Sequence, residues 1–234
     1  MAAAASAPPG WGHFTRRDFF ERLPSAVRRH ELARIPAGDL RLIDEGDPSA
    51  EERLLRAEFW TLVYHLEPER WDQLSRVEPI SPDLIKLLPR VERALDVGAG
   101  SGRLTMHLSL RAGLVGAIEP ALGLAGMLRD RMPGHVQAIA GWAESLPVRD
   151  GWSQLTAACG ALGPEPGLMV ELERVTAPGG VIALINPEES ERFDAGGWER
   201  HDVEPAPVKP HDRWIDDFFG APDPPRVLLM KEVR

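Results

Sequence analysis

Three glycines, Gly98, Gly100 and Gly102, alternate with small residues directly after a short apolar run that ends at Val97. Glycines at such a turn let a ligand approach the backbone closely, with N–H groups as donors. Asp96 lies two residues before the first glycine, and a second acid, Glu119, lies 23 residues after Asp96. A carboxylate at the end of the next strand is suited to accept hydrogen bonds from ribose hydroxyls. This spacing predicts a site for a ligand that contains adenosine.

The spacing of the glycines also distinguishes between adenosine ligands. They follow the pattern G-x-G-x-G, whereas the dinucleotide fingerprint is G-x-G-x-x-G. An acid beside the turn disfavours a pyrophosphate but suits a ligand that carries an amino group and a positive charge. The pattern therefore favours S-adenosylmethionine over NAD. A Walker P-loop is excluded, because no Gly-Lys-Ser or Gly-Lys-Thr occurs in the chain.

The elements that must position this turn alternate between short apolar runs and helical patterns. The sequence predicts strands over residues 94–97, 113–119, 136–140, 155–159, 181–185, 198–203 and 226–233. It predicts helices over residues 103–112, 121–132, 165–176 and 211–219. Such alternation implies right-handed crossovers and a mostly parallel sheet that is covered on both faces. We therefore predict an α/β fold with a doubly wound, seven-stranded sheet.

The N-terminal part of the chain has a different pattern. Residues 1–10 are Ala, Ser, Pro and Gly apart from the initial Met, a composition typical of a disordered tail. Residues 15–90 show helical spacing with start signals at Asp47-Pro48 and Ser81-Pro82, and no strand pattern. The predicted domains are consequently a tail with a helical cap over 1–90 and a ligand-binding domain over 91–234.

The composition excludes several classes of function. The chain has 27 Lys and Arg against 36 Asp and Glu, and no segment of it is basic, so a DNA-binding role is not expected. The single cysteine, Cys159, excludes an internal disulfide and a zinc site of several thiolates, and no metal is expected. No apolar run is long enough to cross a membrane, and the first nine residues make a poor signal peptide. We expect a cytoplasmic protein.

At this point a family resemblance is plain. The run from Leu95 to Gly102 resembles motif I of the class I S-adenosylmethionine-dependent methyltransferases. Further similar blocks follow in the family's order at residues 117–120, 141–147 and 173–180. The resemblance covers roughly residues 92–187. It implies a Rossmann-like methyltransferase fold, S-adenosylmethionine as cofactor, and transfer of a methyl group by in-line displacement.

The resemblance also implies roles for individual residues. Asp96 would lie near the cofactor's amino group, Glu119 would accept the ribose hydroxyls, and the residues after the third strand would border the adenine. Trp142 stands where the family often has Asp, so either Trp142 stacks on the base or a backbone group or Glu144 accepts from it. The expected cofactor-binding residues are Asp96, Gly98, Ala99, Gly100, Glu119, Pro120, Trp142, Ala143, Glu144 and Cys159. No catalytic residue is assigned, and Cys159 is interpreted as a packed small side chain rather than a nucleophile.

The acceptor is predicted from the aromatic residues and from the charge. Aromatic residues concentrate in the helical cap, where Tyr64 and Trp71 are candidates to line an apolar pocket above the methyl group. Together with the absence of a basic segment, this favours a small-molecule acceptor. The alternatives are a protein or RNA methyltransferase, a catalytically silent methyltransferase-fold binding protein, and a nicotinamide-dependent reductase.

Overall fold

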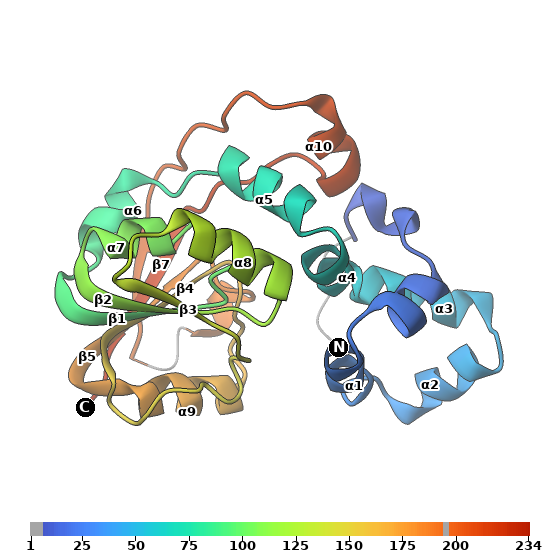
Figure 1. Ribbon diagram of the computed structural model, residues 1–234, viewed down its shortest axis with the longest axis horizontal. Helices are drawn as coiled ribbons and strands as arrows, with labels where there is room; N and C mark the ends of the chain where they lie inside the picture. The colour runs from blue at the N-terminus through green and yellow to red at the C-terminus, as the bar shows by residue number, and fades with distance from the viewer. Residues whose placement is uncertain (1–6, 194–196) are drawn as a thin grey trace. The chain divides into compact units, whose positions relative to one another are not determined.

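The strands around the glycine turn form one seven-stranded sheet in the computed structural model, which describes residues 7–193 and 197–234 (Figure 1). The strands are β1 (Val91–Val97), β2 (Ala112–Ile118), β3 (Val136–Ile139), β4 (Ser153–Cys159), β5 (Thr176–Ile185), β6 (Glu199–Asp202) and β7 (Val227–Glu232). Their order is β3-β2-β1-β4-β5-β7-β6. All pairs among β1 to β5 are parallel, and β7 is antiparallel to both of its neighbours. The predicted doubly wound, seven-stranded, mostly parallel sheet is confirmed.

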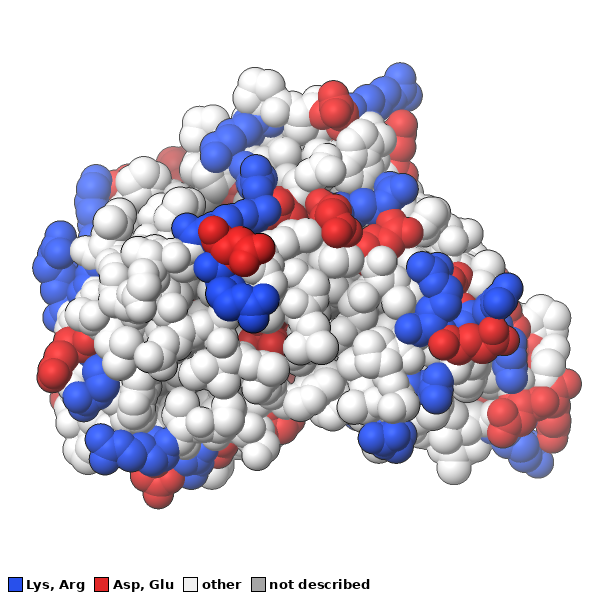
Figure 2. Space-filling view, viewed as in Figure 1, with Lys and Arg blue, Asp and Glu red and all other residues white. Residues whose placement is uncertain are grey.

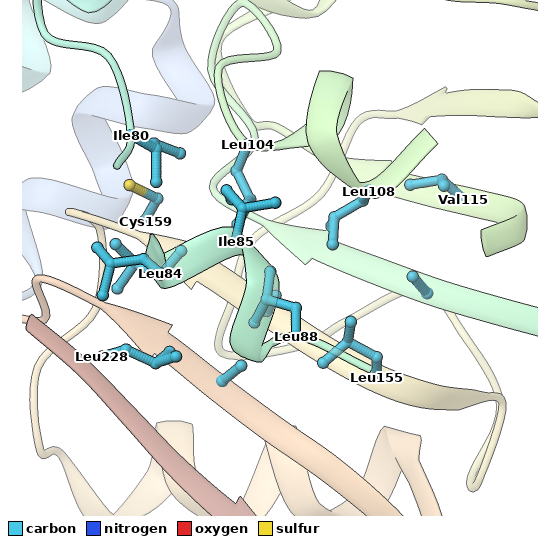
Figure 3. Packing of buried hydrophobic residues seen from close by; sticks show 14 residues of the cluster. Ile80, Leu84, Ile85, Leu88, Leu104, Leu108, Val115, Leu155, Cys159 and Leu228 are labelled. Atoms are coloured by element: carbon cyan, nitrogen blue, oxygen red, sulfur yellow. The ribbon is translucent and has the colours of Figure 1, made fainter. Parts of the chain in front are cut away.

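Helices cover both faces of this sheet. They are α6 (Pro82–Leu87), α7 (Thr105–Ser109), α8 (Leu122–Arg131) and α9 (Pro166–Val175). Figure 1 shows α6, α7 and α8 on one face and α9 on the other. On the first face, Leu84 and Leu88 pack in one buried cluster with Leu155 (Figure 3). On the second face, Leu172 of α9 lies in a cluster with Leu95, so the sheet is buried on both sides, as parallel strands require.

A short helix, η3 (Ser190–Phe193), also belongs to the sheet unit, whereas the other helices lie wholly or, for the helix over Pro68–Val77, mostly in a separate helical unit. They are η1 (Pro9–His13), η2 (Asp18–Arg22), α1 (Ser25–Leu32), α2 (Ala37–Asp44), α3 (Pro48–Ala57), α4 (Phe59–Leu66), α5 (Pro68–Val77) and α10 (Arg213–Phe219). The predicted start signals are confirmed. Asp47 caps α3 by accepting from the N–H of Ala50 at 2.8 Å, and Ser81 caps α6 by accepting from the N–H of Asp83 at 3.3 Å.

The chain divides into two compact units. The helical unit comprises the described residues up to Leu74 and Pro210–Pro222, and the sheet unit comprises the described residues of Ser75–Lys209 and Asp223–Arg234. This division falls earlier than the predicted boundary at residue 90, because α6 packs on the sheet through Leu84 and Leu88. α10, which the sequence placed between two strands of the sheet domain, belongs to the helical unit, where the rings of Phe218 and Phe59 lie 5.5 Å apart.

Two local expectations differ from the structure. Residues 1–6 of the predicted tail lie outside the described residues, but Pro9 and Gly10 begin η1. A Cβ at Gly10 would come 2.6 Å from the ring of Phe218, so the small residue permits close packing there. α7 covers Thr105–Ser109 and is shorter than the predicted 103–112, because the residues after the glycine turn continue as turns and β2 already begins at Ala112.

Candidate functional site

The glycine turn connects β1 to α7 and is attached to the end of the neighbouring strand. The N–H groups of Gly98 and Ala99 both donate to the carbonyl oxygen of Ile118, at 3.0 and 2.9 Å. Gly98, Gly100 and Gly102 have φ values of 71°, 56° and 103°. Residues with a side chain rarely adopt this left-handed region, so the shape of the turn depends on glycine at all three positions.

Gly98→Ala tests this dependence. A Cβ at Gly98 would lie 2.8 Å from Cβ of Ala161, and the positive φ adds backbone strain. We expect the free energy of unfolding to fall by about 2 kcal/mol, measured by urea denaturation. Gly38→Ala is the matched control, because nothing lies within 4 Å of a Cβ there. Equal unfolding midpoints for Gly98→Ala and the wild type would contradict the prediction.

Glu119 follows β2 directly, and the turn and the next loop surround its carboxylate. One carboxylate oxygen accepts from the N–H of Gly100 and the other from the N–H of Ala121, each at 2.8 Å. The side chain is buried. Burial raises the pKa of Glu119 to about 7, since the two N–H donors offset only part of the lost hydration. Each oxygen keeps a further lone pair for a hydroxyl donor.

Asp96 lies at the base of the glycine turn and is fully buried. Its Oδ2 accepts from the hydroxyl of Thr105 at 2.6 Å, whereas Oδ1 has no hydrogen-bond partner among the described residues. Burial, with a contribution from the nearby charge of Glu119, raises the pKa of Asp96 to about 7. A buried carboxylate oxygen without a donor is unfavourable, so this atom is suited to receive a donor from a ligand.

The structure adds an ion pair at this site that the sequence did not predict. The guanidinium of Arg103, next to Gly102, lies 3.1 Å from Oε2 of Glu78, and both side chains are largely buried. The other oxygen of Glu78 accepts from the N–H of Asp223 at 2.9 Å. Burial raises the pKa of Glu78 even though the charge of Arg103 acts in the opposite direction. Arg103 could have been suspected from its place beside the turn, but no local pattern marks Glu78.

Cys159 ends β4 and is buried in the same cluster as Ile80 and Leu84 (Figure 3). Burial raises the pKa of its thiol, which therefore stays protonated at neutral pH. This environment agrees with the interpretation of Cys159 as a packed small side chain rather than a nucleophile.

The turn after β3 holds the residues expected to border the base. The N–H of Ser145 donates to the carbonyl oxygen of Trp142 at 3.2 Å, which closes the turn. Trp142 and Ala143 are half-buried, and Glu144 is exposed. These residues stand at the same edge of the sheet as the glycine turn and Glu119, because β1, β2 and β3 are adjacent parallel strands.

Two further candidates flank the carboxylate of Glu119. Ala99 is buried, and its side chain packs in a small cluster with Ala117 and Leu128. Its possible contact with a ligand is consequently through the backbone. Pro120 is half-buried and lies between Glu119 and Ala121.

Methyltransferases are among the known proteins that resemble part of the chain. No family model matches the chain. Uncharacterized methyltransferases of Mycobacterium bovis and Mycobacterium tuberculosis are each 35% identical to it over 117 residues. The match covers 49% of the chain and 46% of each relative, so the chain spans less than half the length of these proteins.

A solved structure extends the agreement to the fold. One chain of the complex between the Haloferax volcanii Trm112 methyltransferase activator and a methyltransferase superposes with a TM-score of 0.55 at 15% identity. The superposition covers 71% of this chain and 94% of that chain. Together, the strand order and these similarities define the Rossmann-like methyltransferase fold. The chain thus resembles methyltransferases in sequence over about half of its length and shares their fold, in agreement with the resemblance that its glycine turn carries.

Other kinds of site receive no support in the described part of the chain. No three or more His, Cys, Asp or Glu residues there are arranged to hold a metal ion. None of the described helices combines the length and apolar character needed to cross a membrane. On the surface of each unit that Figure 2 shows, basic and acidic side chains lie intermixed.

Proposed function

We propose that the chain is a cytoplasmic enzyme that transfers a methyl group from S-adenosylmethionine to a small-molecule acceptor. The observation that carries this proposal is the pair of buried carboxylates at the glycine turn. Asp96 offers an oxygen without a partner among the described residues, and Glu119 offers lone pairs beside the N–H of Gly100. A ligand with a cationic amino acid group and ribose hydroxyls satisfies both, whereas a polyanion would be repelled.

The strand order supports a placement for each part of this ligand. The end of β2 lies between the glycine turn after β1 and the turn after β3. A ribose held at Glu119 therefore directs the base toward Trp142, Ala143 and Glu144, and the amino acid part toward Asp96. The remaining contacts with S-adenosylmethionine are assigned to Gly98, Ala99, Gly100, Pro120 and Cys159.

When bound, S-adenosylmethionine supplies a methyl group on a sulfonium centre. The residues of the chain bind and align the reactants, which is the main requirement of a displacement with a good leaving group. The buried carboxylates of Asp96 and Glu119 hold the ligand at the edge of the sheet, and the low dielectric around them strengthens each charged contact.

The choice of a small-molecule acceptor rests on charge and on the aromatic residues of the helical unit. The net charge is −9, which disfavours RNA. Within the helical unit, the ring of Trp60 stacks on Tyr64 at 6.0 Å and on Phe219 at 5.7 Å, with Trp71 at its edge. Trp60, Tyr64 and Trp71 are half-buried, and aromatic side chains of this kind are typical of pockets for apolar ligands.

Ligand-dependent thermal unfolding tests the cofactor. S-adenosylmethionine or S-adenosylhomocysteine at 100 times its dissociation constant should add about 2.7 kcal/mol to the stability and raise the midpoint, whereas NADH should not. No rise with either sulfur ligand would contradict the proposal. A rise with NADH alone would favour a reductase.

A transfer assay tests the acceptor. The protein is incubated with methyl-labelled S-adenosylmethionine and with separate low-mass, protein and RNA fractions of a cell extract. Label in the low-mass fraction is expected, and label in protein or RNA would overturn the choice of acceptor. Because the Haloferax volcanii protein is held by an activator, the assay is repeated with whole extract added. A chain that binds cofactor but labels nothing in either format would be a silent binding protein.

A further inference from the structure

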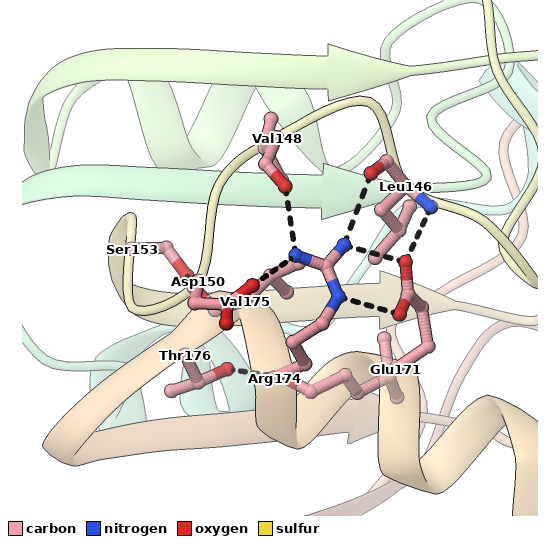
Figure 4. Close-up of polar contacts among 9 residues, drawn as sticks. Leu146, Val148, Asp150, Ser153, Glu171, Arg174, Val175 and Thr176 are labelled. Carbon is pink, nitrogen blue, oxygen red and sulfur yellow. Dashed lines mark hydrogen bonds and ion pairs between the residues drawn. The ribbon is translucent and has the colours of Figure 1, made fainter.

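One side chain of α9 makes hydrogen bonds along a loop that is distant in sequence. Arg174 lies in the last turn of α9, and its guanidinium contacts three residues of the loop between β3 and β4 (Figure 4). Nη1 donates to the carbonyl oxygen of Val148 at 2.9 Å and to the carboxylate of Asp150 at 2.7 Å. Nη2 donates to the carbonyl oxygen of Leu146 at 3.1 Å. One planar group thus fixes three successive points of the loop.

Glu171, one helical turn earlier, completes the arrangement. Its carboxylate accepts from Nε and Nη2 of Arg174 at 2.7 and 2.6 Å, the paired geometry that fits a guanidinium. The same carboxylate accepts from the N–H of Leu146 at 2.6 Å. Both backbone polar groups of Leu146 are therefore bound by α9. The bond to Arg174 holds the pKa of Glu171 below its usual range, which keeps the acceptor charged.

This contact acts on the turn at 142–145. Leu146 directly follows Ser145, whose N–H closes the turn by donating to Trp142. Pro147 packs on the other end, since a Cβ at Gly141 would lie 2.9 Å from Cδ of Pro147. A displacement of Leu146 would therefore move both ends of the turn.

Stability alone does not account for the arrangement. The side chain of Arg174 is 31% exposed and that of Asp150 is 82% exposed. The pair with Asp150 is accessible enough to contribute little to folding, whereas Glu171 is only 15% exposed and is the better-buried partner. Water could bind the carbonyl groups of the loop if Arg174 were absent. Water cannot hold the loop in a fixed position. The guanidinium of Arg174 can, because it is a rigid, fork-shaped group on α9 that bonds to several loop residues at once.

We propose that Arg174, supported by Glu171, is a positioning residue that sets the turn at 142–145 for recognition of the adenine base. This inference rests on the proposed function, which places the base at Trp142, Ala143 and Glu144. The fork holds the turn in the geometry in which its groups meet the edge of the base. Without the fork, the turn still forms but samples several positions.

Calorimetry with two ligands tests the proposal. S-adenosylhomocysteine carries the adenine amino group, and S-inosylhomocysteine replaces it with a carbonyl. Wild type should prefer the first ligand. Arg174→Met should bind S-adenosylhomocysteine about tenfold more weakly and lose most of that preference, as expected for one misplaced hydrogen bond. Its midpoint of thermal unfolding without ligand should stay close to that of the wild type.

Two further variants keep the test clear. Arg174→Lys retains the charge but not the fork, so it should lose the preference as well. Lys86→Met is the matched control, because it removes an exposed i,i+3 ion pair with Asp83 from another helix of the sheet unit. It should bind both ligands as the wild type does.

The outcomes that overturn the proposal are distinct. Unchanged preference in both Arg174 variants would show that the turn does not need the fork. An equal loss of affinity for both ligands, or a large fall in the unfolding midpoint, would show a structural role only. A wild type that binds S-adenosylhomocysteine without preference would remove base recognition from this turn. A wild type that binds neither ligand would overturn the proposed function, and this inference with it.

Discussion

Glu119→Ala should weaken binding of S-adenosylhomocysteine by about 100-fold or more. The carboxylate of Glu119 is held in place by the N–H groups of Gly100 and Ala121, and it is the buried acceptor available to the ribose hydroxyls at the end of β2. Hydrogen bonds to a charged group contribute roughly 1.5–3 kcal/mol each, so the loss of two exceeds a factor of 100 in the dissociation constant. Isothermal titration calorimetry measures this loss directly.

Unfolding of the variant without ligand separates binding from folding. Glu119→Ala frees two backbone N–H groups but also removes a buried carboxyl whose pKa is raised to about 7, so the two effects on stability oppose each other. Glu92→Ala is the matched control, because Glu92 is an exposed acid near the opposite end of β1. Affinity that is the same in Glu119→Ala and the wild type would contradict the assigned role.

Asp96→Asn should change how stability depends on pH. The folded protein keeps the proton of Asp96 up to about pH 7, whereas the unfolded chain releases it near pH 3.8. Between these values the folded state binds more protons than the unfolded state, so the free energy of unfolding of the wild type falls as the pH rises. The whole of this loss of stability is present above pH 7. Asparagine carries no such proton. The free energy of unfolding of the variant, measured relative to that of the wild type, should therefore rise by about 2–3 kcal/mol from pH 5 to pH 8.

Comparison of the two proteins is needed because other groups titrate in the same range. Burial raises the pKa of Glu58 to about 7 and lowers that of His65 to about 4, with opposite effects on the slope. Chemical denaturation of both proteins without ligand, from pH 5 to pH 8, cancels the contributions of Glu58 and His65. The contribution of Glu119 stays in the difference, because its charge acts on Asp96. Parallel curves of unfolding free energy against pH for wild type and Asp96→Asn would show that Asp96 is ionised throughout and would contradict the prediction.

The parts of this protein that short-range patterns control could be predicted from its sequence. Buried parallel strands are short apolar runs, and the turn from β1 into α7 needs glycine at its positive φ positions, so both leave a local signal. The sheet, its seven strands and the proximity of the glycine turn to Glu119 follow from these signals. The residue at which the helical unit ends does not follow from these signals, because α6 has the same amphipathic pattern whether it packs on a helix bundle or on a sheet.

Contacts between distant segments were decided only by the tertiary structure. Glu78 meets Arg103 and the N–H of Asp223, which lies 145 residues further along the chain. Arg174 bonds to Leu146 and Val148 across 28 and 26 residues. Side chains of this kind are common on any surface, and no spacing marks the ones that will meet. Their partners are set by the packing of whole elements, because a hydrogen bond forms only where the fold brings donor and acceptor within about 3 Å.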